Sequence, residues 1–159
     1  DMNLLLRQED NQVTRLRGAL QEVSDAYDYC ICDCGRLLDM VVINILLSTD
    51  LVIAPVKVGG YEIEALMNLQ EQIEDLKDIN PELRIKVLMT MRQKNKTSLE
   101  VEEWLRTESG FEMFETSIRR SIVAEKSTTA LMPLPRFSKR GIVSQDYRAA
   151  VDELIREEE

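Results

Sequence analysis

Histidine is absent from this chain of 159 residues, and cysteine occurs only three times. The lack of histidine excludes every Ser-His or Cys-His arrangement for nucleophilic catalysis within the chain. No apolar run approaches the roughly 20 residues that a membrane-spanning helix needs. The start, Asp1 to Leu4, also lacks the basic stretch and apolar core of a signal peptide. These absences predict a cytoplasmic protein.

The three cysteines, Cys30, Cys32 and Cys34, alternate along one short apolar segment. Because side chains alternate across a strand, all three would lie on one face and could not pair with each other without distortion. A zinc site would need a fourth ligand and a second ligand-bearing segment. We therefore expect reduced, buried thiols rather than disulfides or a metal centre.

Short apolar segments alternate with segments of helical periodicity, and this alternation predicts the fold class. Strands are predicted at residues 29–33, 51–56, 84–91 and 113–118. Helices are predicted at 11–24, 37–47 and 62–77, from a capping box at Thr97–Glu100, from Ile122, and from Ser144 as the last cap. Such βαβ units favour a mostly parallel sheet with helices on both faces. The chain, residues 1–159, is thus predicted to be a single α/β domain.

Two of these helices carry a specific expectation about burial. The 37–47 helix is mostly apolar and should be largely buried. The last helix should turn one apolar stripe towards the core, formed by Tyr147, Val151, Leu154 and Ile155.

Ligands of parallel α/β sheets bind beyond the carboxyl ends of the strands. Here that edge is predicted to comprise residues 33–36, 58–61, 91–94 and 119–125. Asp33 is the most informative of them, because an acid that closes an apolar strand can face a bound ligand. In phosphate-loop proteins such an acid holds Mg²⁺, usually through a water molecule, near the nucleotide phosphates. The alternative role for Asp33 is to cap the helix that follows.

Charge is distributed unevenly along the chain. The segment from Arg119 to Arg148 holds seven bases and two acids, so its net charge is +5, whereas the whole chain carries −9. This asymmetry is typical of a surface that binds a polyanion, although a solvated face that balances acidic neighbours would have the same composition.

Several segments, taken in order, resemble the ParA/Soj-type partition ATPases. The motifs are Tyr27-Asp28-Tyr29 with the apolar run to Asp33-Cys34, Ile43-Asn44 in a helix, Asp50-Leu51-Val52-Ile53-Ala54-Pro55-Val56, Leu88-Met89-Thr90-Met91, Asn95-Lys96-Thr97-Ser98, Thr116 to Arg119 with Ala124-Glu125, and Ser144-x-x-Tyr147. The similarity extends from about Leu16 to Ile155. It identifies the chain as the C-terminal part of such a protein.

The resemblance implies functions for the complete protein. It would bind ATP and magnesium, form a homodimer, bind DNA without sequence preference, and release it when a ParB-like centromere-binding protein stimulates hydrolysis. The implied residues are Asp33 for magnesium (through water), Met91, Arg92, Arg119 and Arg120 for the nucleotide, and Arg136, Lys139, Arg140 and Arg148 for DNA. Ordinary salt bridges are the alternative role for these bases. The implied location is the cytoplasm, on the nucleoid.

The chain also departs from the family pattern. Gly35 and Arg36 replace two prolines, Ile118 replaces a proline, and a Gly-Lys-Pro is missing near Ala130 to Met132. Above all, the Lys-Gly-Gly-x-Gly-Lys-Thr loop that binds phosphates is absent. Without it the chain alone should not hydrolyse ATP. Either the chain is part of a longer ATPase, which we favour, or it is a natural relative without the loop.

Other functions stay open. A MinD-like ATPase would bind membranes through a basic terminal helix, but this chain ends Arg156-Glu157-Glu158-Glu159, so we expect no membrane partner. A pilus- or cellulose-associated relative shares the predicted fold. An iron–sulfur reductase would need cysteines on two separate loops. A non-enzymatic scaffold that binds DNA or a protein is the alternative from a different class.

Overall fold

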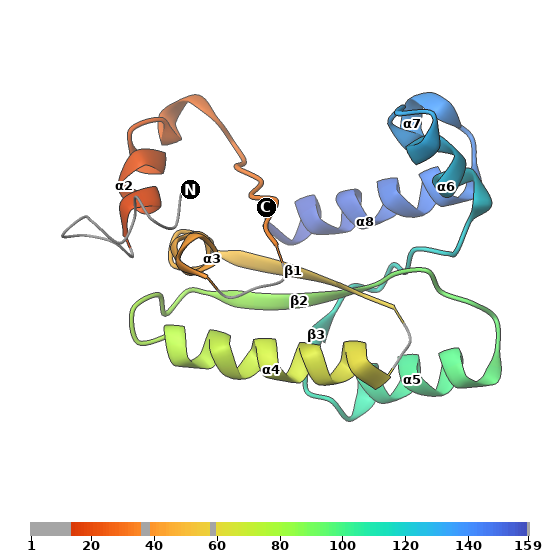
Figure 1. Cartoon of the computed structure of the whole chain (residues 1–159), viewed down its shortest axis with the longest axis horizontal. Coiled ribbons are helices and arrows are strands. Elements are labelled where there is room, and N and C mark those ends of the chain that lie inside the picture. Colours follow the sequence, from red (N-terminus) through yellow and green to blue (C-terminus); the bar gives the residue numbers. More distant parts are fainter. Residues whose placement is uncertain (1–13, 36–38, 58–59, 159) are drawn as a thin grey trace. The chain divides into compact units, whose positions relative to one another are not determined.

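The structure is a computed structural model that describes residues 14–35, 39–57 and 60–158 (Figure 1). Two compact units are distinguished. Unit 1 comprises Asp1–Val52 and Leu69–Arg84, and unit 2 comprises Ile53–Asn68 and Ile85–Glu159. Among the described residues, no helix is both long and apolar enough to cross a lipid bilayer.

The described strands form one three-stranded sheet, in the order β1 (Leu51–Val56), β2 (Arg84–Met89) and β3 (Glu112–Met113). Strands β2 and β3 are parallel, with Lys86 opposite Glu112. Strand β1 accepts backbone hydrogen bonds at both ends, from Arg84 N–H at 3.0 Å (Asp50 O) and from Thr90 N–H at 2.7 Å (Val56 O). The predicted α/β class with a parallel sheet is confirmed.

The strand boundaries differ from the prediction where the backbone leaves the extended conformation. Strand β1 has the predicted bounds, but β2 ends at Met89, because Met91 has a positive φ of 50°. Strand β3 covers only two residues, and single hydrogen bonds then continue towards β2, from Phe114 N–H to Val87 O and from Ile118 N–H to Met89 O.

The predicted strand at 29–33 is wrong. Residues 28–35 have neither helix nor strand in this structure, and Ile31 is 93% exposed. A strand persists only when its backbone groups have partners in a ladder, and no described residue supplies them here. The prediction that the cysteines are buried is wrong for Cys30 and Cys34, which are exposed, whereas Cys32 is half-buried.

Within unit 2, helices cover both faces of the sheet (Figure 1). The first part of α4 (Gly60–Leu76) and α5 (Lys96–Thr107) lie on one face, and α8 (Ile142–Glu158) lies on the other. Helix α5 begins before the predicted capping box, because Asn95 is its N-cap and accepts a hydrogen bond from Ser98 N–H at 2.8 Å.

Helix α8 presents a different face to the core from the one predicted. Val143 and Ala150 are buried against Phe114 and Ile118, with Leu154 partly buried beside them. Tyr147, Val151 and Ile155 are instead exposed, at 45%, 52% and 37%. Ser144 is not the cap either. It lies inside the helix, where its hydroxyl donates to Ser138 O at 2.6 Å.

Two acids share this buried face of α8, which explains why the prediction failed. Asp146 is 8% exposed and Glu153 is 4% exposed. Glu153 accepts the backbone N–H groups of Glu115 (2.6 Å) and Thr116 (2.9 Å) and lies 3.7 Å from the buried Lys86 Nζ. Lys86 also pairs with Glu157 and with Glu112. A buried carboxylate is tolerated when it accepts this many hydrogen bonds.

Two short helices precede α8. Helix α6 (Ile122–Thr129) begins as predicted, with Ser121 as its N-cap, and α7 (Leu134–Phe137) starts directly after Pro133. One residue from each, Ala124 and Leu134, packs against the α8 core.

Unit 1 holds α2 (Arg15–Gln21), the 3-10 turn η1 (Ser24–Ala26), α3 (Met40–Leu46) and the end of α4. Helix α3 is capped by Asp39, which accepts hydrogen bonds from Val41 and Val42. Asn44, Leu46 and Leu47 are fully buried and the other described residues of 39–47 are half-buried, so the helix is shorter than expected and its burial is partial. Asn80 closes the unit by donating to Leu46 O (3.1 Å) and Thr49 O (2.8 Å).

The Glu153 contacts predict a specific acid sensitivity. Burial alone would raise the pKa of Glu153, but the N–H groups of Thr116 and Glu115 and the Lys86 charge lower it below its usual range. The resulting stabilisation is present at neutral pH and is lost as pH falls from about 4.3, the ordinary Glu value, through the lower folded pKa. We expect Glu153→Gln to reduce the free energy of unfolding by about 1–3 kcal/mol at pH 7 and to flatten its acid dependence.

Urea unfolding over a pH series measures both effects. Asp152→Asn is the matched control, because Asp152 is an exposed acid on the same helix. If the free energy of unfolding depends on acid pH equally in the Glu153→Gln variant and in the unsubstituted chain, Glu153 is not the source of the acid sensitivity.

Candidate functional site

The carboxyl ends of β2 and β3 bring together two of the predicted site segments. Arg92 N–H donates to Ile118 O at 3.0 Å, and Arg120 N–H donates to Arg92 O at 3.1 Å, so 91–92 and 118–120 lie side by side. Met91 at this edge is 57% exposed. The left-handed backbone of Met91 is uncommon for a residue other than glycine and is enriched at functional sites.

Arg119 makes a bidentate ion pair with Asp146 of α8. Its Nε and Nη2 donate to the carboxylate at 2.8 and 2.5 Å, and its backbone N–H donates at 3.1 Å. Hydrogen bonding to Arg119 lowers the pKa of Asp146, so this carboxylate is ionised at neutral pH. The pair anchors the 118–120 loop to α8 and leaves the Arg119 guanidinium less available to a ligand.

The other two bases at this edge differ from each other. Arg92 Nε donates to Glu102 of α5 at 2.5 Å, and the same glutamate pairs with Arg106 at 3.3 Å. Arg120 is exposed and makes no ion pair with another described residue. Of the three arginines predicted for the nucleotide, Arg120 is therefore the one with a free charge in the described part of the chain.

Asp33 belongs to unit 1 and is exposed in an irregular segment, not at the end of a strand. Among the described residues, no group of three His, Cys, Asp or Glu side chains is placed to hold a metal ion. Arg36, Val58 and Gly59, which also belong to the predicted edge, lie outside the described residues. A magnesium role for Asp33 stays a prediction.

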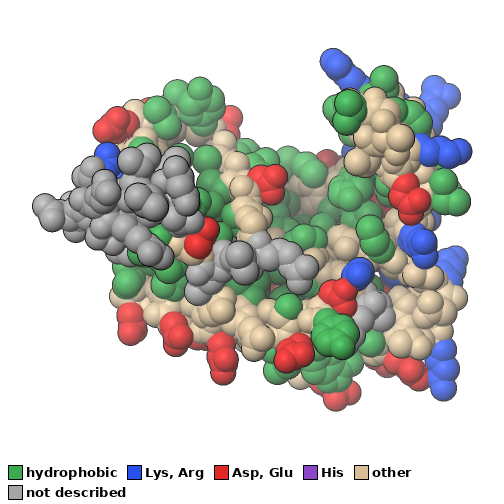
Figure 2. Space-filling model, in the orientation of Figure 1, with side chains coloured by type: hydrophobic (Ala, Val, Ile, Leu, Met, Phe, Trp, Pro, Cys, Tyr) green, Lys and Arg blue, Asp and Glu red, His purple; other side chains and the backbone are tan. Residues whose placement is uncertain are grey.

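The four predicted DNA-binding residues are all exposed in unit 2. Arg148 of α8 donates to Lys139 O at 2.9 Å, and Gln145 donates to Arg140 O at 3.2 Å, so the 138–141 loop is held against the start of α8. Arg136 lies in the preceding helix α7. Figure 2 shows basic side chains gathered over α6, α7 and the start of α8.

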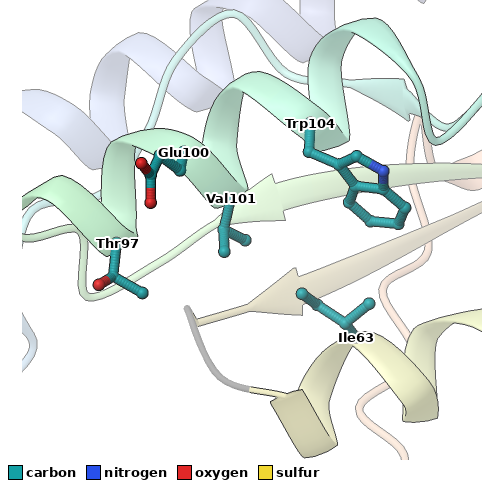
Figure 3. Close-up of a pocket in the computed structure, with 5 residues that line it drawn as sticks. All are labelled: Ile63, Thr97, Glu100, Val101 and Trp104. Atoms are coloured by element: carbon teal, nitrogen blue, oxygen red, sulfur yellow. The ribbon is translucent and has the colours of Figure 1, made fainter.

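A shallow apolar groove lies between the start of α4 and α5 (Figure 3). Ile63 faces Val101 and Trp104 across it, and Thr97 and Glu100 form its other end. Its volume is about 300 Å³. The groove presents few polar groups to fix a ligand, so it does not have the character of a nucleotide site.

Comparison with known proteins agrees with this parallel α/β arrangement of strands. Residues 1–85 match the AAA domain family. The chain is 28% identical over 151 residues to the chromosome partitioning protein ParA of Myxococcus xanthus. The chain belongs to the AAA domain family, in its ParA-type branch.

The match covers most of this chain but only part of each relative. An uncharacterised protein of Pseudomonas putida is 32% identical over 146 residues, which are 90% of this chain and 56% of that protein. For the Myxococcus protein the shares are 93% and 53%. The chain thus spans about half the length of the curated ParA-type relatives it matches.

Solved structures show the same fold at low sequence identity. The apo McdA structure from Cyanthece has a TM-score of 0.77 at 16% identity and covers 96% of this chain and 63% of its own. A putative plasmid partition protein from Borrelia burgdorferi, bound to AMPPNP, has a TM-score of 0.74 at 21% identity and covers 94% of this chain and 58% of its own. Cobyrinic acid a,c-diamide synthase from Mycobacterium smegmatis, with a bound ATP analog and magnesium, has a TM-score of 0.68 at 21% identity, covering 87% and 59%.

The residues that the sequence interpretation missed in this ParA-type chain are the buried ion partners, namely Asp146, Glu153 and Lys86. A signal for them exists in retrospect. Asp146 and Glu153 are seven residues apart on one helix and alternate with Val143 and Ala150, so they share the inner stripe. Lys86 sits on β2 two residues before Leu88, on the same side of the strand.

The unequal exposure of the three thiols predicts an order of chemical reactivity. Burial, followed by the neighbouring Cys30 and Cys34, raises the pKa of Cys32, which lowers its thiolate fraction at neutral pH. In the native 159-residue chain we expect Cys30 and Cys34 to react with a maleimide before Cys32, and the Cys32 rate to increase most steeply with pH. Peptide mass spectrometry after timed quenching measures each rate. Equal rates at all three positions would contradict the structure of this segment.

Proposed function

We propose that this chain is part of a ParA-type partition ATPase whose complete form binds ATP and magnesium. The observation that carries the proposal is the edge at which 91–92 and 118–120 are hydrogen-bonded together beyond parallel strands, the usual position of a ligand in such sheets. The family and the fold support it. In this interpretation the complete protein is an ATP hydrolase, and the chain alone, which lacks the phosphate loop, is inactive.

Within this proposal the edge residues have different tasks. Met91 and Arg120 are the groups that face the nucleotide, since Met91 is exposed and Arg120 is unpaired among the described residues. Arg92 and Arg119 act mainly through their ion pairs with Glu102 and Asp146, which hold the two loops in place. Asp33 would hold Mg²⁺ through a water molecule once its segment is paired as a strand.

The exposed segment around Cys30 supports a longer polypeptide. Cys30, Cys34 and Ile31 are exposed to water here, an unusual place for such side chains. We infer that further chain of the complete protein supplies the ladder partner that this segment lacks among the described residues.

The proposed partners follow from charge and family. The bases Arg136, Lys139, Arg140 and Arg148 would bind the DNA backbone without sequence preference, since phosphate contacts come from Lys and Arg. The complete protein would form a homodimer, respond to a ParB-like centromere-binding protein, and work in the cytoplasm on the nucleoid. A chain without the phosphate loop that serves as a DNA- or protein-binding scaffold is the second candidate, and Arg120 would then have no nucleotide partner.

The first experiment concerns ATP and Asp33. We expect the full-length product of the encoding gene to bind ATP with Mg²⁺. Asp33→Ala should weaken its Mg²⁺ affinity by about 10–100-fold, as is typical when a group that orients a metal-bound water is removed. Titration of ATPase turnover with Mg²⁺ measures this. Asp25→Ala, an exposed acid nearby, is the control. If ATPase turnover of Asp33→Ala depends on Mg²⁺ as in the unsubstituted protein, Asp33 does not hold the metal ion.

The second experiment concerns DNA. Reversing the charge of Arg136, Lys139 and Arg140 to Glu should lower duplex affinity. It should also reduce the slope of log affinity against log salt by roughly 0.9 for each phosphate that the variant no longer neutralises. A matched triple reversal at Arg17, Lys77 and Lys96, outside the basic segment, should leave the slope intact. If the slope of log affinity against log salt is unchanged in the first variant, Arg136, Lys139 and Arg140 do not contact DNA phosphates.

A further inference from the structure

The turn that ends α6 holds a leucine in a conformation normally occupied by glycine. Leu131 has φ of +50°. Its N–H donates to Thr128 O at 3.0 Å, and Met132 N–H donates to Ser127 O at 3.0 Å. These two bonds form a Schellman motif in which Leu131 is the left-handed residue. Leucine in this backbone conformation is less stable than glycine, because its Cβ crowds the neighbouring carbonyl.

The Leu131 side chain adds little packing to the fold. It is 93% exposed, and Met132 beside it is 44% exposed. The apolar contact that often completes such a motif, between Met132 and the residue at 127, is not available, because position 127 is a serine. Packing of this region depends instead on Ala124 and Leu134, which face the α8 core. A residue that combines an unfavourable backbone conformation with an apolar side chain exposed to water is a candidate for function.

The surroundings of this tip, residues 131–132, combine apolar and basic side chains. Phe137 is 39% exposed and Ile142 is 60% exposed. Between residues 121 and 145 the chain has four bases, Lys126, Arg136, Lys139 and Arg140, and a single acid, Glu125. Figure 2 shows hydrophobic and basic side chains intermixed over α6 and α7. The positive charge selects a polyanionic partner, and the tip adds an apolar contact to it.

We propose that the tip Leu131-Met132 inserts into a groove of duplex DNA while the surrounding bases contact the phosphates. The inference rests on the DNA binding proposed above and adds a contact that salt does not screen. Proteins that widen or kink a duplex use Leu, Met and Pro as apolar wedges against base steps, and Leu131, Met132 and Pro133 are consecutive here. A lipid surface is less suited, because α6 has 8 residues and α7 has 4, too short for an interfacial amphipathic helix.

The test compares Leu131→Gly with the unsubstituted full-length product of the encoding gene, with ATP and Mg²⁺ present, because the DNA binding proposed above is that of the complete protein. Glycine relieves the left-handed backbone, so the midpoint of thermal unfolding should rise. Anisotropy of a labelled random-sequence duplex should show about tenfold lower affinity at every salt concentration, as expected when one leucine side chain is no longer buried. The salt slope should not change, because every phosphate-binding base is still present. Leu131→Asn, which also tolerates positive φ, should reproduce the weaker binding, and Leu99→Ala, an exposed leucine on α5, should bind like the unsubstituted chain.

Each other outcome overturns the inference in a different way. If Leu131→Gly binds duplex as well as the unsubstituted chain, the tip has no role and the DNA binding proposed above stands. If the unsubstituted chain binds anionic phosphatidylglycerol vesicles but no duplex, both the tip proposal and the DNA proposal fail. If Leu131→Gly abolishes concentration-dependent self-association and leaves DNA affinity intact, the tip contacts a second copy of the chain.

Discussion

Two carboxylates on the inner face of α8 hold the strand ends and loops of unit 2 together. Glu153 accepts the backbone N–H groups after β3, and Asp146 accepts the backbone and guanidinium N–H groups of Arg119 further along the chain. These contacts use the charge-assisted hydrogen bonds that offset the cost of burying an acid. The position of residues 118–120, and with it the candidate nucleotide edge, therefore depends on α8 as much as on the sheet.

This arrangement gives the arginines of the edge unequal roles. Arg92 and Arg119 use their charge within the protein, on Glu102 and Asp146, whereas Arg120 keeps its charge towards solvent. Pre-organised loops bind a ligand at lower entropic cost than mobile ones. An edge built in this way owes its shape to ion pairs, and Arg120 is the arginine of the three that keeps its charge for another partner among the described residues.

The sequence predicted those parts of the fold that depend on local pattern. The apolar run at 51–56 became β1 with the predicted bounds, and the parallel class followed correctly from alternating helices and strands. The prediction of a strand at 29–33 was wrong because a strand needs a neighbouring strand to hydrogen-bond with, and sequence periodicity does not show whether one is present. The buried face of α8 was predicted wrongly because Tyr147, Val151 and Ile155 form an apolar stripe. The two acids that are actually buried have their partners, Arg119 and Thr116, far away in sequence. Buried ion pairs are invisible to hydropathy alone.

Strand β1 is one of the two edge strands of the described sheet. The N–H and C=O groups of successive residues in a strand point alternately to its two sides. Asp50 and Val56 direct their carbonyls to β2, so the odd-numbered positions between them direct theirs outward. Pro55 is one of these odd positions, and proline has no N–H to donate. Any strand that docks on this side can accept hydrogen bonds from Leu51 and Ile53 but none from Pro55. The chemistry of the edge thus limits how far a ladder can extend, which disfavours indiscriminate sheet-to-sheet aggregation.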